Sequence, residues 1–277
     1  MTSSFVRIGG VPHHVVLEGS GPPCVLSGGL GMAWFDWDAV AALLAPHRTV
    51  IRFDRPGLGL SGHARVAPSL TGEADRILRV LDACGVSGPA TVVGHSLAGF
   101  HAEAFARLHP SRVAALVLVD SSVEEGARPR PAPALRTGAA RLAAGALSAA
   151  GLPCAVGPLL RRAAVRASRT GGGDPAPYEL VRRVYGTSRS MRALLVENAR
   201  YRDLAAELVY VRRQFELPRG VPVTVIAAGE GRRWLERQAR LAVALGAELR
   251  ISSGSGHLVM FDRPGDVASA VLWPRAG

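Results

Sequence analysis

Short runs of apolar, mostly β-branched residues alternate with longer segments of helical apolar spacing through most of this 277-residue chain. A run such as VAALVLVD (113–120) is apolar almost throughout, which is typical of a parallel strand buried on both faces. We predict strands at 13–19, 23–28, 48–54, 90–94, 113–120, 221–229 and 247–252. We predict helices at 36–45, 71–84, 97–109, 233–245 and 265–272. The alternation therefore predicts an α/β fold with a mostly parallel sheet and helices on both faces, and HHVVLEG (13–19) suits an antiparallel edge strand.

The alternation stops near residue 121 and resumes near residue 220. Near its start the interval contains ARPRPAPALR, and it continues with alanine-rich and arginine-rich segments that have a helical pattern and lack strand signals. We therefore predict a core domain of residues 1–120 and 218–277. We predict an α-helical cap (121–217) inserted after strand 6, which is the segment 113–120. Within the cap, residues 142–160 carry no charge, but prolines interrupt them, which argues against a membrane span. We expect this segment to face the substrate.

The basic charge of the chain does not indicate a nucleic-acid partner. All 33 basic residues are arginine, the formal net charge is +11, and residues 121–220 hold 17 Arg against 8 acidic residues, or +9. Aromatic residues are 5% of the chain, so a platform on which bases could stack is not expected. The arginines suit either a solvated surface or a basic rim that attracts a small-molecule substrate that is acidic or bound to a carrier. The oligomeric state stays open.

The cysteines and the N-terminus favour a cytoplasmic protein. The first 14 residues contain no apolar run long enough for a signal peptide. Three cysteines, widely spaced in apolar text, suit free thiols in a reducing compartment rather than a metal site. We expect neither a metal ion nor a cofactor.

The segment VVGHSLAGF (92–100) carries the chemistry. Ser96 follows a predicted strand and precedes a predicted helix, with Gly94 two residues before it and Ala98 two residues after it. Small residues at these positions permit a sharp strand-to-helix turn that exposes a serine hydroxyl above the sheet. The helix dipole there favours developing negative charge. Ser96 is therefore the candidate nucleophile.

A serine hydroxyl needs a base, and His257 is the candidate. It lies in SSGSGHLVMFDRP, just past the last predicted strand, and it follows the serine in the chain order typical of such sites. His95 is next to the nucleophile, but we expect it to point away from Ser96.

Several segments together make the chain similar to the α/β-hydrolase superfamily, and more narrowly to small bacterial serine hydrolases with a helical cap. They are GHSLAG, GGLGMAWFDW, RFDRPGLGLSG, LVLVDSS and GSGHLVMFDRP. The resemblance covers 1–120 and 218–277 and implies hydrolysis of an ester, a thioester, an amide or a related bond.

The resemblance leaves two candidates for the acid that orients the histidine. Many relatives carry an aspartate after the seventh strand, where this chain has Arg232. Asp120, at the end of VAALVLVD, occupies an alternative position used by some relatives and is our choice. Glu230 is the alternative acid. The acid holds the imidazole tautomer and stabilises the imidazolium.

The resemblance also implies an oxyanion hole. One donor is the backbone N–H of Leu97, directly after the nucleophile, and matching GGLGMAWFDW to the relatives gives Leu30 as the other. Gly28 replaces a histidine common at that position.

These residues predict a serine hydrolase that cleaves an ester or thioester through an acyl-enzyme intermediate. A thioesterase, acyltransferase or cyclase of secondary metabolism could use the same site. The alternative to an enzyme is a non-hydrolytic protein that uses the same scaffold to bind a ligand.

Overall fold

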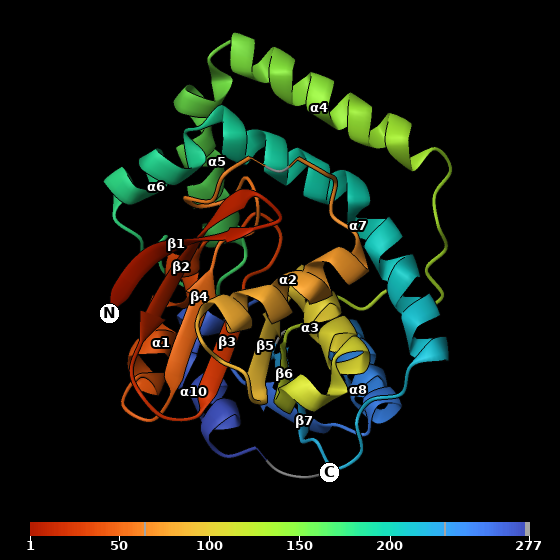
Figure 1. Ribbon diagram of the computed structural model, residues 1–277. Helices are drawn as coiled ribbons and strands as arrows, with labels where there is room; N and C mark the ends of the chain where they lie inside the picture. Colours follow the sequence, from red (N-terminus) through yellow and green to blue (C-terminus); the bar gives the residue numbers. More distant parts are fainter. Residues whose placement is uncertain (64, 230, 275–277) are drawn as a thin grey trace.

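A computed structural model describes residues 1–63, 65–229 and 231–274, and its centre is an eight-stranded sheet (Figure 1). Its strands are β1 (Thr2–Ile8), β2 (Val11–Glu18), β3 (Pro23–Ser27), β4 (Thr49–Phe53), β5 (Ala90–His95), β6 (Val113–Val119), β7 (Val223–Ala228) and β8 (Glu248–Ser252). Their order is β1-β2-β4-β3-β5-β6-β7-β8. The pairs β1–β2 and β2–β4 are antiparallel and the others are parallel, so the predicted mostly parallel sheet is confirmed.

Strand β1 was not predicted, and the prediction that HHVVLEG forms the edge was wrong. Strand β1 is the edge, and β2 lies between β1 and β4. The first four residues of β1 are exposed, as suits an edge strand, so its sequence has little of the apolar character by which the other strands were predicted.

Helices cover both faces of the sheet because successive strand side chains point to opposite sides. On β5, Val92 packs into the apolar cluster with α2, α3 and α8, whereas Val93 packs into the cluster with α1 and α10. Leu116 and Val117 divide in the same way on β6. The helices of these layers are α1 (Asp38–Leu44), α2 (Leu70–Ala83), α3 (Leu97–Leu108), α8 (Arg232–Leu245) and α10 (Pro264–Leu272). The shorter elements are the 3-10 helices η1 (Trp34–Trp37) and η2 (Pro110–Arg112) and the short α-helix α9 (Val259–Asp262).

Four further helices occupy the chain between β6 and β7. They are α4 (Pro133–Ala149), α5 (Leu152–Ala167), α6 (Tyr178–Tyr185) and α7 (Ser188–Gln214). Figure 1 shows α4, α5 and α6 above one end of the sheet, and α7 running from there towards α3, which it contacts. The division into a core (1–120, 218–277) and a cap (121–217) stays a prediction that agrees with this element order. Below, "the cap" means residues 121–217.

The uncharged segment 142–160 spans the end of α4 and the first half of α5. Among the described residues no single helix has the length and hydropathy to cross a membrane, although α4 and α5 together pass that test across a bend of 108°. Leu147, Leu152 and Val156 line a cavity that also contains Ser96, so part of this segment faces the candidate site.

Candidate active site

Ser96 lies at the turn between β5 and α3 in a strained backbone conformation. Its φ is 51° and its ψ is −120°, values that a non-glycine residue seldom adopts and that are typical of functional turns. The glycines around it are required by space. A Cβ on Gly94 would lie 2.8 Å from the Cβ of Ala102, and one on Gly99 would lie 2.7 Å from the Cβ of Ser121. The small residues in the sequence therefore allow α3 to start directly behind the strand.

His257 and Asp120 meet across 137 positions of sequence. His257 Nδ1 donates a hydrogen bond to Asp120 Oδ2 at 2.6 Å. The other carboxylate oxygen, Oδ1, accepts from the backbone N–H of Ala228 at 2.8 Å and from Trp234 Nε1 at 2.7 Å. Asp120 follows β6, is 1% exposed and has a φ of 40°. Three donors thus fix the carboxylate, and the carboxylate in turn places the proton of His257 on Nδ1, which leaves Nε2 free to act as a base.

Ser96 and His257 line the same cavity, which has a volume of about 740 Å³. No hydrogen bond joins Ser96 Oγ to His257 among the described residues, and in an unliganded site such a bond often forms only when substrate is bound. The lining is mostly apolar and comes from both the core and the cap, including Leu30, Met32, Leu58, Leu147, Leu152, Val156, Leu160, Met191, Leu194, Leu195 and Leu258. The cavity suits an apolar substrate.

The loop of residues 28–31 runs beside the candidate nucleophile. A Cβ on Gly29 would lie 3.1 Å from the Cβ of Ser96, so the glycine allows the two backbones this approach. In the described part of the chain, the backbone N–H groups of Leu30 and Leu97 have no acceptor. These are the two groups that the sequence predicted as oxyanion donors.

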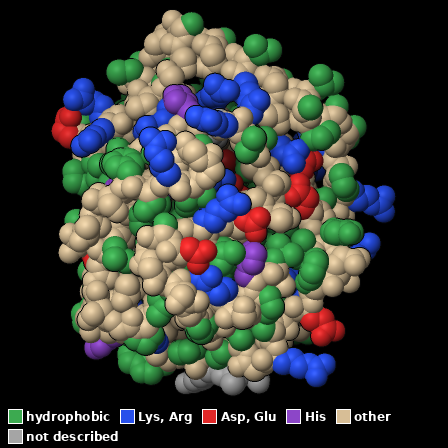
Figure 2. Space-filling view, viewed as in Figure 1, with side chains coloured by type: hydrophobic (Ala, Val, Ile, Leu, Met, Phe, Trp, Pro, Cys, Tyr) green, Lys and Arg blue, Asp and Glu red, His purple; other side chains and the backbone are tan. Residues whose placement is uncertain are grey.

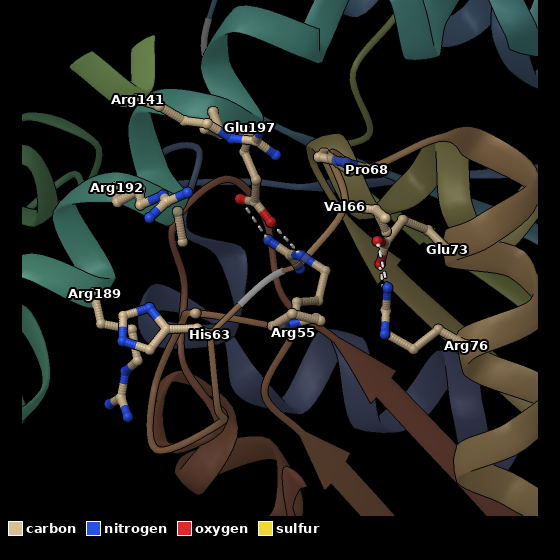
Figure 3. A pocket seen from close by; sticks show the side chains of 14 residues that line it. Arg55, His63, Val66, Pro68, Glu73, Arg76, Arg141, Arg189, Arg192 and Glu197 are labelled. Atoms are coloured by element: carbon tan, nitrogen blue, oxygen red, sulfur yellow. Dashed lines mark hydrogen bonds and ion pairs between the residues drawn. The ribbon is translucent and has the colours of Figure 1, made fainter. Parts of the chain in front are cut away.

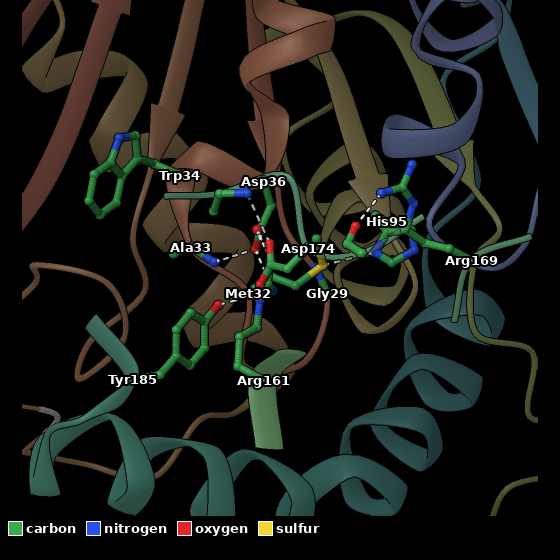
Figure 4. Close-up of polar contacts among 12 residues, drawn as sticks. Gly29, Met32, Ala33, Trp34, Asp36, His95, Arg161, Arg169, Asp174 and Tyr185 are labelled. Carbon is green, nitrogen blue, oxygen red and sulfur yellow. Dashed lines mark hydrogen bonds and ion pairs between the residues drawn. The ribbon is translucent and has the colours of Figure 1, made fainter. Parts of the chain in front are cut away.

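His95 differs from its prediction. Its ring does not point away from the site but lines the same cavity as Ser96, with its centroid 4.6 Å from that of His257. Its Nε2 donates to the carbonyl oxygen of His257 at 2.9 Å, and its Nδ1 lies 3.2 Å from the sulfur of Met32 (Figure 4). Burial, and then the charge of a protonated His257, hold the pKa of His95 well below its ordinary value, so this ring is neutral and supports the backbone of His257.

A buried ion-pair cluster joins the cap to the core beside the cavity (Figure 4). Arg161 of α5 pairs with Asp36 of η1 and, at 3.0 Å, with Asp174. Its guanidinium also lies 3.2 Å from the hydroxyl of Tyr185. Arg161 is the single arginine among the described residues that line the cavity, and its charge is matched there. Most cap arginines lie elsewhere, and Figure 2 shows arginine side chains gathered in the upper half of the visible face, where Figure 1 places the cap.

The remaining sequence candidates are placed as follows. Glu230, the alternative acid, lies outside the described residues. Arg232, which stands where many relatives carry the acid, is 93% exposed and pairs with Glu236 at 3.0 Å. No group of three His, Cys, Asp or Glu side chains could hold a metal ion within the described ranges.

Sequence reasoning missed Trp234 and the role of His95. A tryptophan near the start of a helix was a usable signal, because a buried indole N–H needs an acceptor. Its acceptor could not be identified, because Asp120 is 114 positions away.

The chain is similar to known proteins over nearly its whole length. Residues 24–270 match the model of the alpha/beta hydrolase family. Polyketide synthase ThaQ of Burkholderia thailandensis is 30% identical over 98% of this chain, and the match spans only 13% of that long protein. The pimeloyl-[acyl-carrier protein] methyl ester esterase of Klebsiella pneumoniae is 40% identical over 35% of this chain and 36% of its own length.

A solved structure extends the likeness of fold. Cfl2 from Burkholderia cenocepacia superposes with a TM-score of 0.78 at 21% identity, covering 98% of this chain and 94% of the other. The family match begins in β3 and runs through β8, so it includes the parallel part of the sheet and the helices between β6 and β7. The predicted family is therefore confirmed: this chain belongs to the alpha/beta hydrolase family.

Proposed function

We propose that this protein is a serine hydrolase that cleaves an ester or thioester through an acyl-enzyme intermediate. The observation that carries the proposal is the hydrogen bond from His257 to Asp120, with the second oxygen of Asp120 already satisfied by two other donors. This arrangement leaves the far nitrogen of His257 as a base, in a cavity that also holds the strained Ser96.

The mechanism follows from these positions. His257 Nε2 takes the proton of Ser96 as Oγ attacks the acyl carbon, and Asp120 stabilises the imidazolium that forms. The backbone N–H groups of Leu97 and Leu30 stabilise the oxyanion, because they are fixed before the reaction begins. His257 then protonates the leaving alcohol or thiol. Water, activated by the same histidine, releases the acid and restores Ser96.

The cavity supports an apolar acyl group as substrate. Its lining leucines, methionines and valines favour an aliphatic chain, since each buried methylene contributes about 0.8 kcal/mol. The name of the Klebsiella relative describes an ester on an acyl carrier protein, and that of the Burkholderia relative a polyketide synthase. These names favour a carrier-bound acyl substrate, and they make acyl transfer to an alcohol or amine, or cyclisation, the second candidate function.

Labelling of Ser96 tests the proposal. A fluorophosphonate should modify wild-type protein at one site, and Ser96→Ala should abolish the modification and lower ester turnover by at least ~10³-fold. Ser253→Ala, which changes an exposed serine of the loop before His257, is the matched control and should retain both. If folded wild-type protein is not labelled, or if Ser96→Ala keeps its function, a ligand-binding role replaces the hydrolase.

The reaction product distinguishes hydrolysis from acyl transfer or cyclisation. We expect an acyl thioester to yield free acid in water. If the acyl group passes instead to an added alcohol or amine, or if an intramolecular hydroxyl captures it, the protein is a transferase or cyclase with the same site.

A further inference from the structure

A second buried ion pair joins the cap to the core, directly behind the loop of residues 28–31. Arg55 follows β4 in the core, and Glu197 lies in α7 of the cap. Arg55 Nε contacts Glu197 Oε1 at 2.6 Å and Nη2 contacts Oε2 at 3.0 Å (Figure 3). The two side chains are only 4% and 8% exposed.

Both partners also bind the backbone of that loop. Arg55 donates through Nη1 to the carbonyl oxygen of Gly28 and through Nη2 to that of Gly29, at 2.7 Å. Glu197 Oε2 accepts from the backbone N–H of Gly31 at 3.1 Å. The ion pair therefore holds the peptide groups on both sides of Leu30, and the N–H of Leu30 is left without an acceptor among the described residues.

The cap helix contacts the same loop through its apolar side chains. Gly31 has a φ of 68°, and a Cβ there would lie 2.6 Å from Cδ1 of Leu194, one turn before Glu197 in α7. The loop thus lies between Ser96 on one side and α7 on the other. A movement of α7 would displace the loop.

A buried ion pair is weak evidence of a contribution to stability, because desolvation opposes the Coulomb attraction. Burial by itself lowers the pKa of Arg55, but the Glu197 carboxylate raises it further, so the guanidinium keeps its charge. A charged, rigid fork that binds two carbonyl oxygens at once is well suited to fixing a backbone conformation.

We propose that Arg55 and Glu197 are positioning residues that aim the Leu30 N–H at the oxyanion and make catalysis depend on α7 being seated against the core. This inference rests on the proposed serine hydrolase function. Neither side chain touches the reacting atoms, since both act through residues 28–31.

Glu197→Gln tests the inference, with Asp203→Asn as the matched control. Asp203 is also a buried carboxylate of α7, but it pairs with Arg136 and Arg200 inside the cap and makes no bond to residues 28–31. Steady-state kinetics on an aryl ester and binding of an alkyl boronic acid, which forms a tetrahedral adduct with serine, are measured for each variant.

We expect Glu197→Gln to lower kcat by about 10- to 100-fold with KM changed less than about 3-fold, because an oxyanion donor acts mainly on the transition state. Boronic acid affinity should fall in parallel with kcat. Asp203→Asn should keep both within about 3-fold of wild type.

A second variant covers the case in which Glu197→Gln does not fold. Arg55→Lys keeps the positive charge but cannot bridge two carbonyl oxygens and the carboxylate. It should therefore also lower kcat while leaving KM nearly unchanged. The inference is overturned if a folded variant of either residue keeps kcat and boronic acid affinity, or if Asp203→Asn loses as much as Glu197→Gln. Fluorophosphonate labelling of wild-type protein decides the hydrolase proposal independently of these variants.

Discussion

Asp120→Asn should inactivate the protein while leaving its fold intact, and the contacts of Asp120 show why. Oδ1 faces two donors, Ala228 N–H and Trp234 Nε1–H, whereas Oδ2 faces His257. An asparagine that turned its NH₂ towards the two donors would leave both without an acceptor, at about 1–3 kcal/mol each. The asparagine oxygen must therefore take the place of Oδ1, and the NH₂ must face His257.

The wrong tautomer of His257 follows from this orientation. Facing an NH₂ donor, Nδ1 has to accept, so the proton moves to Nε2, the atom that must receive the proton of Ser96. A loss of this kind lowers kcat by about 10⁴-fold, which corresponds to about 5.4 kcal/mol in the activation free energy. The thermal midpoint should change much less than the activity, since the shape of the side chain is conserved.

The assay compares ester turnover and thermal unfolding of Asp120→Asn with those of Glu230→Gln, which tests the alternative acid. We expect Glu230→Gln to retain at least about a tenth of wild-type kcat. The reasoning is refuted if Asp120→Asn remains that active, and the assignment of the acid reverses if Glu230→Gln is the inactive variant.

Two further predictions concern the stability of the protein in acid and the length of the acyl chain that its cavity accepts. Burial, its largest cause, lowers the pKa of His101 from 6.5 to about 3, so the unfolded chain binds a proton below pH 6.5 that the folded chain rejects. Stability should therefore fall as pH drops from 6.5 towards 3. Between pH 6.5 and 5, the free energy of unfolding of His101→Gln should fall by about 2 kcal/mol less than that of wild type, as measured by urea unfolding. Equal falls in the two proteins would contradict the lowered pKa of His101. Val156→Trp should displace about three methylenes of a long acyl chain from the cavity, worth about 2.4 kcal/mol or ~60-fold in kcat/KM, with little effect on acetyl esters. A uniform loss across a series of p-nitrophenyl esters would place the acyl chain elsewhere.

The sequence predicted the elements whose signals are local. Apolar runs gave the parallel strands, and the small residues around Ser96 gave the turn, because a sharp strand-to-helix connection excludes larger side chains there. The helix predicted at 71–84 is observed at 70–83, where Ser69 caps it by accepting from Gly72 N–H. Strand β1 escaped prediction because most of its side chains are exposed.

Contacts between distant segments could not be predicted in this way. Trp234 meets Asp120, and Glu197 meets Arg55, only because α8 and α7 pack at particular angles against the sheet. Those angles depend on side-chain packing over the whole domain rather than on any local pattern. The family resemblance supplied candidate residues, but it did not indicate that a cap helix holds the 28–31 loop.

Of the described non-glycine residues, only Ser96, Asp120 and Ala132 have a positive φ, and two of these three are proposed catalytic residues. Such conformations cost about 1–3 kcal/mol each. Ser96→Gly would relieve that strain while removing the proposed nucleophile. The substitution would therefore raise the free energy of unfolding and abolish the proposed activity. Directed evolution that selected only for heat resistance would therefore enrich inactive variants at these two positions, and an activity screen would have to run beside it.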